Sequence, residues 1–361
     1  MRHTAAHVVR ELMLPVRQTR VVGGVFVMRI TTTPIISRRL LLSSGAAFAA
    51  SLAAPSAFAQ NWPQKPVRVL VGFAAGGNID NLARVTCARL SDVFGQQFVV
   101  ENRVGAMGTL AANDVVRATA DGHTFFWAGT GTVSIFPAMG KPPYSMKDLA
   151  PVSLIGTSPQ VLIVNGKLPI KTLQEFVAWV KSRPKELAYA GGGGPGSVSN
   201  LLMALFLKRA GLEMNAVSYR GTAPALTDII GGHVPAMFIP LPEALPHAAN
   251  GAVRLLALSD DRRATQAKDV PTIAESGFPG FRGVSWNGMM APAATPRAII
   301  DRVANEFIKA TKDPQFIAQL DKYGASPLSL TPEEFGKFIQ EDMALWAEAV
   351  KVAGVTLDSA N

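Results

Sequence analysis

The stretch VRVLVGFAAGGNID, at residues 67–80, is the starting point for predicting the fold of this chain. Its first five residues include three valines and a leucine, a composition typical of a buried strand. Gly76 and Gly77 follow as a turn, and the pattern over residues 80–93 predicts a helix. A strand, a glycine-rich turn and a helix in this order indicate the first half of a parallel β–α–β unit.

Strands and helices alternate along most of the remaining chain. We predict strands at residues 97–101, 123–128, 152–155, 160–164, 187–190, 216–219, 236–239 and 253–258, and helices at 109–119, 172–182, 198–209 and 223–230. The region 296–354 is mainly helical, with helix starts at Pro296 and Thr331. Alternation at these lengths indicates an α/β protein with parallel sheets covered on both faces.

Two further glycine-rich turns precede predicted helices in the same way as Gly76 and Gly77. They are GGGGPGS at residues 191–197 and YRGT at residues 219–222. Such turns leave backbone N–H groups free at the positive end of a helix dipole, where an anion is stabilised without a metal. One such turn is ordinary in an α/β protein, and three together favour an anion-binding protein.

The composition excludes several classes of protein. The 361 residues are 48% hydrophobic and 17% charged, which excludes intrinsic disorder. The net charge of +9 is uneven, because residues 1–59 hold seven arginines and one glutamate, which leaves 28 basic and 25 acidic residues elsewhere. The folded part is therefore close to neutral, and we do not expect nucleic-acid binding.

The first 59 residues have the pattern of an export signal. Two adjacent arginines, Arg38 and Arg39, precede an apolar run over residues 40–54, and AFA at residues 57–59 is a small-x-small cleavage site. We predict cleavage near Ala59 and Gln60. The arginine pair fits the twin-arginine route, and an ordinary secretory signal fits equally well. We also expect that translation begins at Met28.

Motifs for catalysis or metal binding were sought and not found. The histidines after residue 60 lack metal-ligand spacing, and no Gly-x-Ser-x-Gly elbow is present. Residues 191–197 resemble a phosphate loop, but Ser197 stands where the lysine is needed. Cys87 has no partner for a disulfide and lies in a predicted helix, which favours a place in the core. We expect no catalytic residue, metal or cofactor.

Eight segments in a fixed order resemble the Bug-type receptors of tripartite tricarboxylate transporters, which are exported solute-binding proteins. These segments are WPQKP (62–66), FAAGGNID (73–80), VENRVGA (100–106), DGHT (121–124), DLAPV (148–152), YRGTAPALTD (219–228), VPTIAESG (270–277) and WNGMMAP (286–292). Each fragment alone is a weak signal, and their shared order over nearly the whole mature chain is a strong one.

The resemblance implies a two-lobed periplasmic-binding-protein-like fold of type II, with two crossing hinge strands and a ligand cleft between the lobes. The first lobe is expected at residues 60–160 plus 284–361 and the second at 161–283. The implied function is a periplasmic receptor that captures a small organic carboxylate for a tripartite tricarboxylate-type transporter, as a monomer, with an integral membrane permease as partner. Two alternatives stay open: an exported enzyme acting on an organic acid, and a ligand sensor that docks to a membrane signalling protein.

The resemblance also implies the ligand-binding residues. In the family the ligand carboxylate lies against the loop after the first strand, and turns of the opposite lobe complete the site. The positions that match are Phe73, Ala74, Gly76, Gly77 and Asp80 in the first loop, Thr130 and Thr132 after the third strand, and Gly194, Ser197, Asn200, Arg220, Gly221, Thr222 and Ala223 in the opposite lobe.

Several of these residues have a second interpretation. Asp80 could accept an amino group or hold water, or it could cap the following helix. Arg220 could pair with a second carboxylate or extend into solvent. Ser197 and Thr222 could donate to the ligand, cap helices, or do both. Trp286, with Trp127, could line the cleft or lie in the core.

The chain departs from the family pattern at three positions beside the expected pocket. Met107 stands where a glycine is frequent. A serine that is common near Gly191 is absent, and Asn200 replaces a histidine. The identity of the ligand therefore cannot be transferred from a relative.

Overall fold

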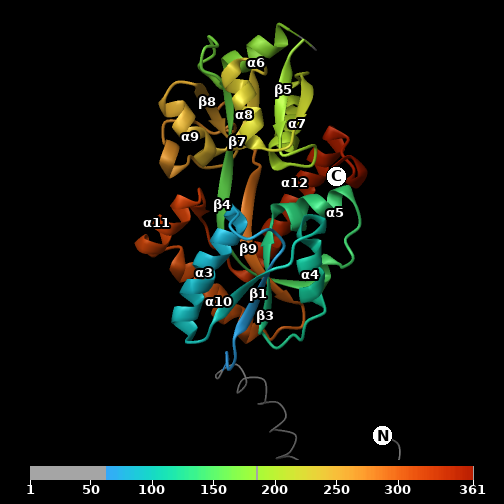
Figure 1. Cartoon of the computed structure of the whole chain (residues 1–361), viewed down its shortest axis with the longest axis vertical. Coiled ribbons are helices and arrows are strands. Elements are labelled where there is room, and N and C mark those ends of the chain that lie inside the picture. The colour runs from blue at the N-terminus through green and yellow to red at the C-terminus, as the bar shows by residue number, and fades with distance from the viewer. Residues whose placement is uncertain (1–61, 184–185, 361) are drawn as a thin grey trace, which may run out of the picture. The chain divides into compact units, whose positions relative to one another are not determined.

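The computed structural model describes residues 62–183 and 186–360 (Figure 1). The export signal predicted over residues 1–59, its cleavage near Gln60 and the start at Met28 lie outside the described residues.

The first sheet is built around the stretch that opens the mature chain. Strands β1 (Val67–Val71), β2 (Phe98–Asn102) and β3 (Thr124–Gly129) are parallel, with β1 in the middle. β9 (Val284–Pro292) pairs antiparallel with β3, and β4 (Leu149–Asn165) pairs antiparallel with β9 and with the short β10 (Ser326–Pro327). The helices that follow or flank these strands are α3 (Asn78–Phe94), α4 (Thr109–Val116), α5 (Phe136–Met139), α10 (Arg297–Ala310) and α11 (Pro314–Lys322).

Strand β4 continues from this sheet into the second half of the fold, as Figure 1 shows. Up to Pro159 it pairs with β9, and from Gln160 it pairs on its two sides with β7 (Ala236–Pro240) and β8 (Val253–Leu258). A separate parallel pair consists of β5 (Ala188–Gly192) and β6 (Asn215–Tyr219). The helices of this half are α6 (Leu173–Lys181), α7 (Val198–Ala210), α8 (Thr222–Gly231) and α9 (Leu241–Ala249).

Most predicted elements are found within a few residues of their expected positions, and three predictions need correction. The strands predicted at 152–155 and 160–164 are parts of one 17-residue strand, β4. The large sheet is mixed rather than parallel, because both crossing segments run antiparallel to their neighbours, and only the separate β5–β6 pair is wholly parallel. Helix α9 was not predicted; its sequence contains Pro242 and Pro246, and proline is an unfavourable residue inside a helix.

Helix α12 (Pro332–Ala353) packs against both halves of the fold. Its first part places Phe335 and Phe338 against Trp286 of β9, in the core beside the first sheet. Its second part places Trp346 and Ala349 in the other core, with residues of α7. The short helix α13 (Leu357–Ala360) follows. Strand β4 changes partners between Pro159 and Gln160, next to the lobe boundary predicted at residues 160 and 161. That the two lobes move relative to each other stays a prediction.

Candidate functional site

A cavity of about 490 Å³ lies where the ends of several strands and the first turns of three helices meet. Its lining residues are Phe73, Asn78, Ile79, Met107, Gly129, Thr130, Gly131, Ile135, Ser158, Gln160, Gly196, Ser197, Val198, Pro240, Pro242, Glu243, Ser285, Trp286, Asn287, Lys322, Tyr323 and Gly324. A volume of this size suits a small organic molecule.

The loop after β1 reaches the cavity through Phe73 and through the start of α3 at Asn78. Ala74, Gly76 and Gly77, which the resemblance also implies, belong to the same loop but do not line the cavity. At this predicted anion-binding turn, the first turn of α3 lines the cavity, and Gly76 and Gly77 do not.

Asp80 lies behind that loop and holds its shape. The side chain is fully buried and accepts hydrogen bonds from Gly76 N at 2.9 Å, Arg84 Nε at 2.8 Å and Asn102 Nδ2 at 2.8 Å. Burial alone raises the pKa of Asp80, but hydrogen bonds from Arg84, Asn102 and Gly76 lower it overall. Asp80 does not line the cavity, so its contacts support the interpretation in which it stabilises the start of α3.

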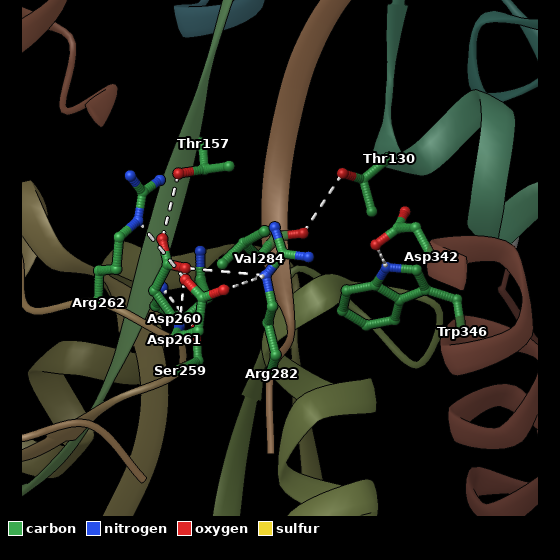
Figure 2. A network of polar contacts seen from close by, with 11 residues as sticks. Thr130, Thr157, Ser259, Asp260, Asp261, Arg262, Arg282, Val284, Asp342 and Trp346 are labelled. Carbon is green, nitrogen blue, oxygen red and sulfur yellow. Dashed lines mark hydrogen bonds and ion pairs between the residues drawn. The ribbon is translucent and has the colours of Figure 1, made fainter. Parts of the chain in front are cut away.

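Two threonines follow β3 and have different positions. Thr130 lines the cavity, and its hydroxyl accepts a hydrogen bond from Trp286 N at 2.8 Å. The same hydroxyl donates to Val284 O at 3.5 Å (Figure 2). Thr132 is fully buried, does not line the cavity, and donates to Met107 O at 2.7 Å. Met107 has a φ of 52°, a left-handed conformation that favours glycine.

The turn before α7 is the second predicted anion-binding turn, and it also reaches the cavity. Gly196 and Ser197 line it, whereas Gly194 does not. The Ser197 hydroxyl caps α7 by accepting from Asn200 N at 3.2 Å. Because a serine hydroxyl accepts through a lone pair and keeps its own proton, Ser197 can cap the helix and still donate to a ligand.

Asn200 lies behind this turn, outside the cavity lining. It donates to Pro195 O at 2.7 Å and accepts from the Tyr189 hydroxyl at 3.2 Å. A Cβ atom added at Gly191 would lie 2.6 Å from Asn200 Oδ1, which is closer than real Cβ contacts. Gly191 and Asn200 are therefore sterically linked.

The third predicted turn, before α8, does not line the cavity. Arg220, Gly221, Thr222 and Ala223 are all absent from the lining. Thr222 Oγ1 donates to Glu243 Oε2 at 2.6 Å, and Glu243 does line the cavity. In this structure the turn contacts the cavity lining through the hydrogen bond from Thr222 to Glu243, and a direct role of its residues in ligand binding stays a prediction.

Several lining residues were not predicted from the sequence. Ser158 and Gln160 belong to β4, and Ser285 and Asn287 belong to β9. Others come from the start of α9 and the end of α11, where Glu243 and Lys322 are the charged residues of the lining. The predicted lobe boundaries at residues 160/161 and 283/284 indicate these two segments, but they do not indicate which side chains of each strand face the cavity.

A buried polar network lies along the crossing segments, next to the cavity (Figure 2). Asp260 accepts from Thr157 Oγ1 of β4 at 3.1 Å and faces Arg282 Nε at 3.8 Å, just before β9. The Arg282 guanidinium also lies 4.8 Å from the ring centre of Phe338 on α12. Burial, reinforced by Asp261, raises the pKa of Asp260 to about 6.

A second buried carboxylate, Asp342 of α12, lies on the other side of Arg282. It accepts from Trp286 Nε1 at 2.6 Å and from Trp346 Nε1 at 3.0 Å. Burial raises the pKa of Asp342 to about 6, although the hydrogen bonds from the two tryptophans lower it in part. Trp286 thus has both predicted roles, because it lines the cavity and is fully packed in the core. Trp127 lies in the core and does not line the cavity.

Cys87 has the core position that the sequence favours. It is buried in α3, and desolvation raises its thiol pKa to about 12. Within residues 62–183 and 186–360, no cluster of three or more histidine, cysteine, aspartate or glutamate side chains is arranged for a metal ion. In the same part of the chain, every helix is too short or too polar to cross a membrane.

Two α/β halves, crossing strands between them and a cavity at their loops define the class of two-lobed solute-binding proteins. The family model described as "Tripartite tricarboxylate transporter family receptor" matches residues 82–355. Protein BugT from Bordetella pertussis is 35% identical over 314 residues, which cover 85% of this chain and 95% of BugT. The chain belongs to the tripartite tricarboxylate transporter receptor family, and the resemblance seen in the sequence is confirmed.

Solved structures agree with this assignment. An R. palustris protein solved with adipate is 32% identical, with a TM-score of 0.67, over 82% of this chain and 99% of that one. MatC from Rhodopseudomonas palustris with bound malate is 31% identical, with a TM-score of 0.62, over 80% of this chain and 100% of MatC. The predicted two-lobed α/β fold is therefore confirmed.

Proposed function

We propose that this chain is an exported, periplasmic receptor that binds one small organic carboxylate in the cavity and performs no chemistry on it. Membership of the receptor family supports this function, and so do the relatives solved with adipate and malate. The observation that carries the proposal is that α3 and α7, from opposite halves of the fold, both begin at the cavity.

The carboxylate is expected between the first turns of α3 and α7. Both turns place free backbone N–H groups and the positive end of a helix dipole at the cavity. Helix α9 also begins there, but Pro242 lacks an N–H group and Glu243 is acidic, which disfavours a carboxylate at that side. Ser197 adds a hydroxyl donor, and Phe73 an apolar wall.

A ligand held by both halves stabilises the form of the protein in which they approach each other. We propose that an integral membrane permease recognises this ligand-bound form, and that the receptor acts as a monomer. Cross-linking of the membrane fraction, with and without ligand, tests the permease. Light scattering of the purified protein tests the monomer.

The proposed function is tested with residues 60–361, unfolded and refolded to remove any carried-over ligand, in a thermal-shift panel of small carboxylates. A ligand at about 100 times its Kd adds about 2.7 kcal/mol to the unfolding free energy, and the melting temperature should rise by several degrees. A folded protein that no carboxylate stabilises, or one that converts its ligand to a product, would contradict the proposal.

A further inference from the structure

Four polar residues of the cavity lining belong to the two crossing strands, β4 and β9: Ser158, Gln160, Ser285 and Asn287. We call these four residues the floor of the cavity. In the β4–β9 pairing, Ser158 stands opposite Ser285, and Gly156 stands opposite Asn287. On its other side, Asn287 stands opposite Gly129 of β3. Asn287 therefore has a glycine on each neighbouring strand, so neither neighbour contributes a side chain that could cover its amide.

Two atoms of this floor have no hydrogen-bond partner within the described protein: Ser158 Oγ and Asn287 Oδ1. The residues are only 8% and 5% exposed, and both line the cavity. Buried polar atoms are nearly always paired, because leaving one unpaired is costly. Thr130 and Ser197, which line the same cavity, use their hydroxyls within the protein. The floor pair differs from them in having no such contact.

The chemistry of the two atoms restricts what can pair with them. An amide oxygen only accepts hydrogen bonds, so Asn287 Oδ1 requires a donor. An ionised carboxylate has no proton to donate and cannot satisfy it. An ammonium group can donate, but the crossing-strand residues of the lining carry no charge, and Glu243, at the start of α9, already accepts from Thr222. A buried cation without an opposite charge beside it is strongly disfavoured. A hydroxyl can donate to Asn287 Oδ1 and accept from Ser158 Oγ.

We propose that Asn287 and Ser158 recognise a hydroxyl group on the ligand, so that the receptor selects a hydroxy acid over the unsubstituted acid. This inference rests on the proposed function, in which the cavity holds a small carboxylate near α3 and α7. In this inference the ligand makes a second contact, with Asn287 and Ser158 on the crossing strands, in addition to the contact of its carboxylate with α3 and α7. This second contact determines which acid is bound.

The test compares ligands of equal chain length that differ in one substituent. Calorimetry on the stripped protein uses propionate with lactate, succinate with malate and with aspartate, and glutarate with 2-hydroxyglutarate. At least one hydroxy acid should bind about tenfold or more tightly than its unsubstituted partner, since a site built for a hydroxyl discriminates strongly against its absence. This comparison needs no variant, so it does not depend on the folding of a mutant.

Variants then locate the preference. Asn287→Leu and Ser158→Ala should each reduce the ratio of the two affinities to about one, mainly by weakening the hydroxy acid. Thr295→Val is the matched control, because Thr295 Oγ1 is also buried and without a partner but lies outside the cavity lining. It should leave the ratio unchanged.

The outcomes separate this inference from the proposed function. Equal binding of both members of every pair would overturn the hydroxyl assignment and leave carboxylate binding intact. Tighter binding of aspartate than of malate, lost in Asn287→Leu, would assign an ammonium to the floor and also overturn it. Absence of binding by any carboxylate to the folded protein would overturn the proposed function itself.

Discussion

At the scale of single residues, Gly191 and Asn200 show how a small residue makes room for a larger side chain behind the α7 turn. Asn200 fills the space beside Gly191, where it donates to Pro195 O and accepts from Tyr189. A serine at position 191 would place its Cβ 2.6 Å from the Asn200 amide oxygen. The small residue and the asparagine are therefore one structural unit behind the α7 turn.

We expect Gly191→Ala to lower the unfolding free energy by about 1–3 kcal/mol, because overpacking a buried site forces its neighbours to move. In an Asn200→Ala background the same change should cost less, with a coupling of about 1 kcal/mol. Urea unfolding followed by circular dichroism measures both. Gly77→Ala is the control, since its added Cβ approaches nothing closer than Ala74 O at 3.4 Å. Additive effects of the two substitutions would contradict the steric link.

Sequence reasoning identified cavity residues where local patterns mark them. Phe73 follows a strand, and Ser197 caps the start of a helix, so both could be placed from the chain around them. Ser158 and Asn287 could not, because strand residues reach a cavity only when two distant segments pair in one register. Asp80 and Thr132 have the right types and positions but hold neighbouring backbone instead.

At the scale of elements, the starts of helices contribute to stability, and in the proposed function two of them also bind the ligand. Ser197 caps α7 at the cavity, and Thr172 caps α6 away from it by accepting from Glu175 N at 3.1 Å. The sequence predicted both helix starts closely, because capping residues are local signals. It missed α9 and the continuity of β4, whose long course through both halves depends on pairing with remote strands.

Ser197→Ala and Thr172→Ala should each lower the unfolding free energy by about 1 kcal/mol through loss of a cap. Only Ser197→Ala should also weaken carboxylate binding, by roughly tenfold, because it removes a donor at the cavity. Calorimetry with a ligand from the carboxylate panel measures the affinity. Equal affinity of the two variants for that ligand would show that Ser197 serves the helix alone.

At the scale of the whole molecule, the two halves are joined by more than the crossing strands. Helix α12 packs on both cores, and its Asp342 accepts from a tryptophan of β9 and from another on α12 itself. Arg282 connects this region to Asp260, beside β4. The buried carboxyl groups of Asp260 and Asp342 lie where the chain crosses between the two halves. A change in the protonation of either group should therefore change the free energy of unfolding.

Asp342 makes this dependence measurable. Its pKa of about 6 in the folded protein exceeds the value of about 3.9 in an unfolded chain. The folded state therefore binds the proton more tightly, and stability from this group is full at low pH and falls as pH rises from about 4 through 6. In Asp342→Asn the group stays neutral. The unfolding free energy of the wild type relative to this variant should then fall by about 1 kcal/mol between pH 5 and pH 7.

Urea unfolding of both proteins at the two pH values gives this difference, in which contributions shared by the two proteins, such as that of Asp260, cancel. Glu101→Gln is a control with a different pH window. Its hydrogen bond with Arg68 lowers the pKa of Glu101 from its ordinary value of 4.5, so the wild-type advantage there should be nearly constant between pH 5 and pH 7 and be lost only at lower pH. A wild-type minus Asp342→Asn difference that does not change with pH would mean that Asp342 is already ionised in the folded protein at pH 5, held by its tryptophan donors and Arg282.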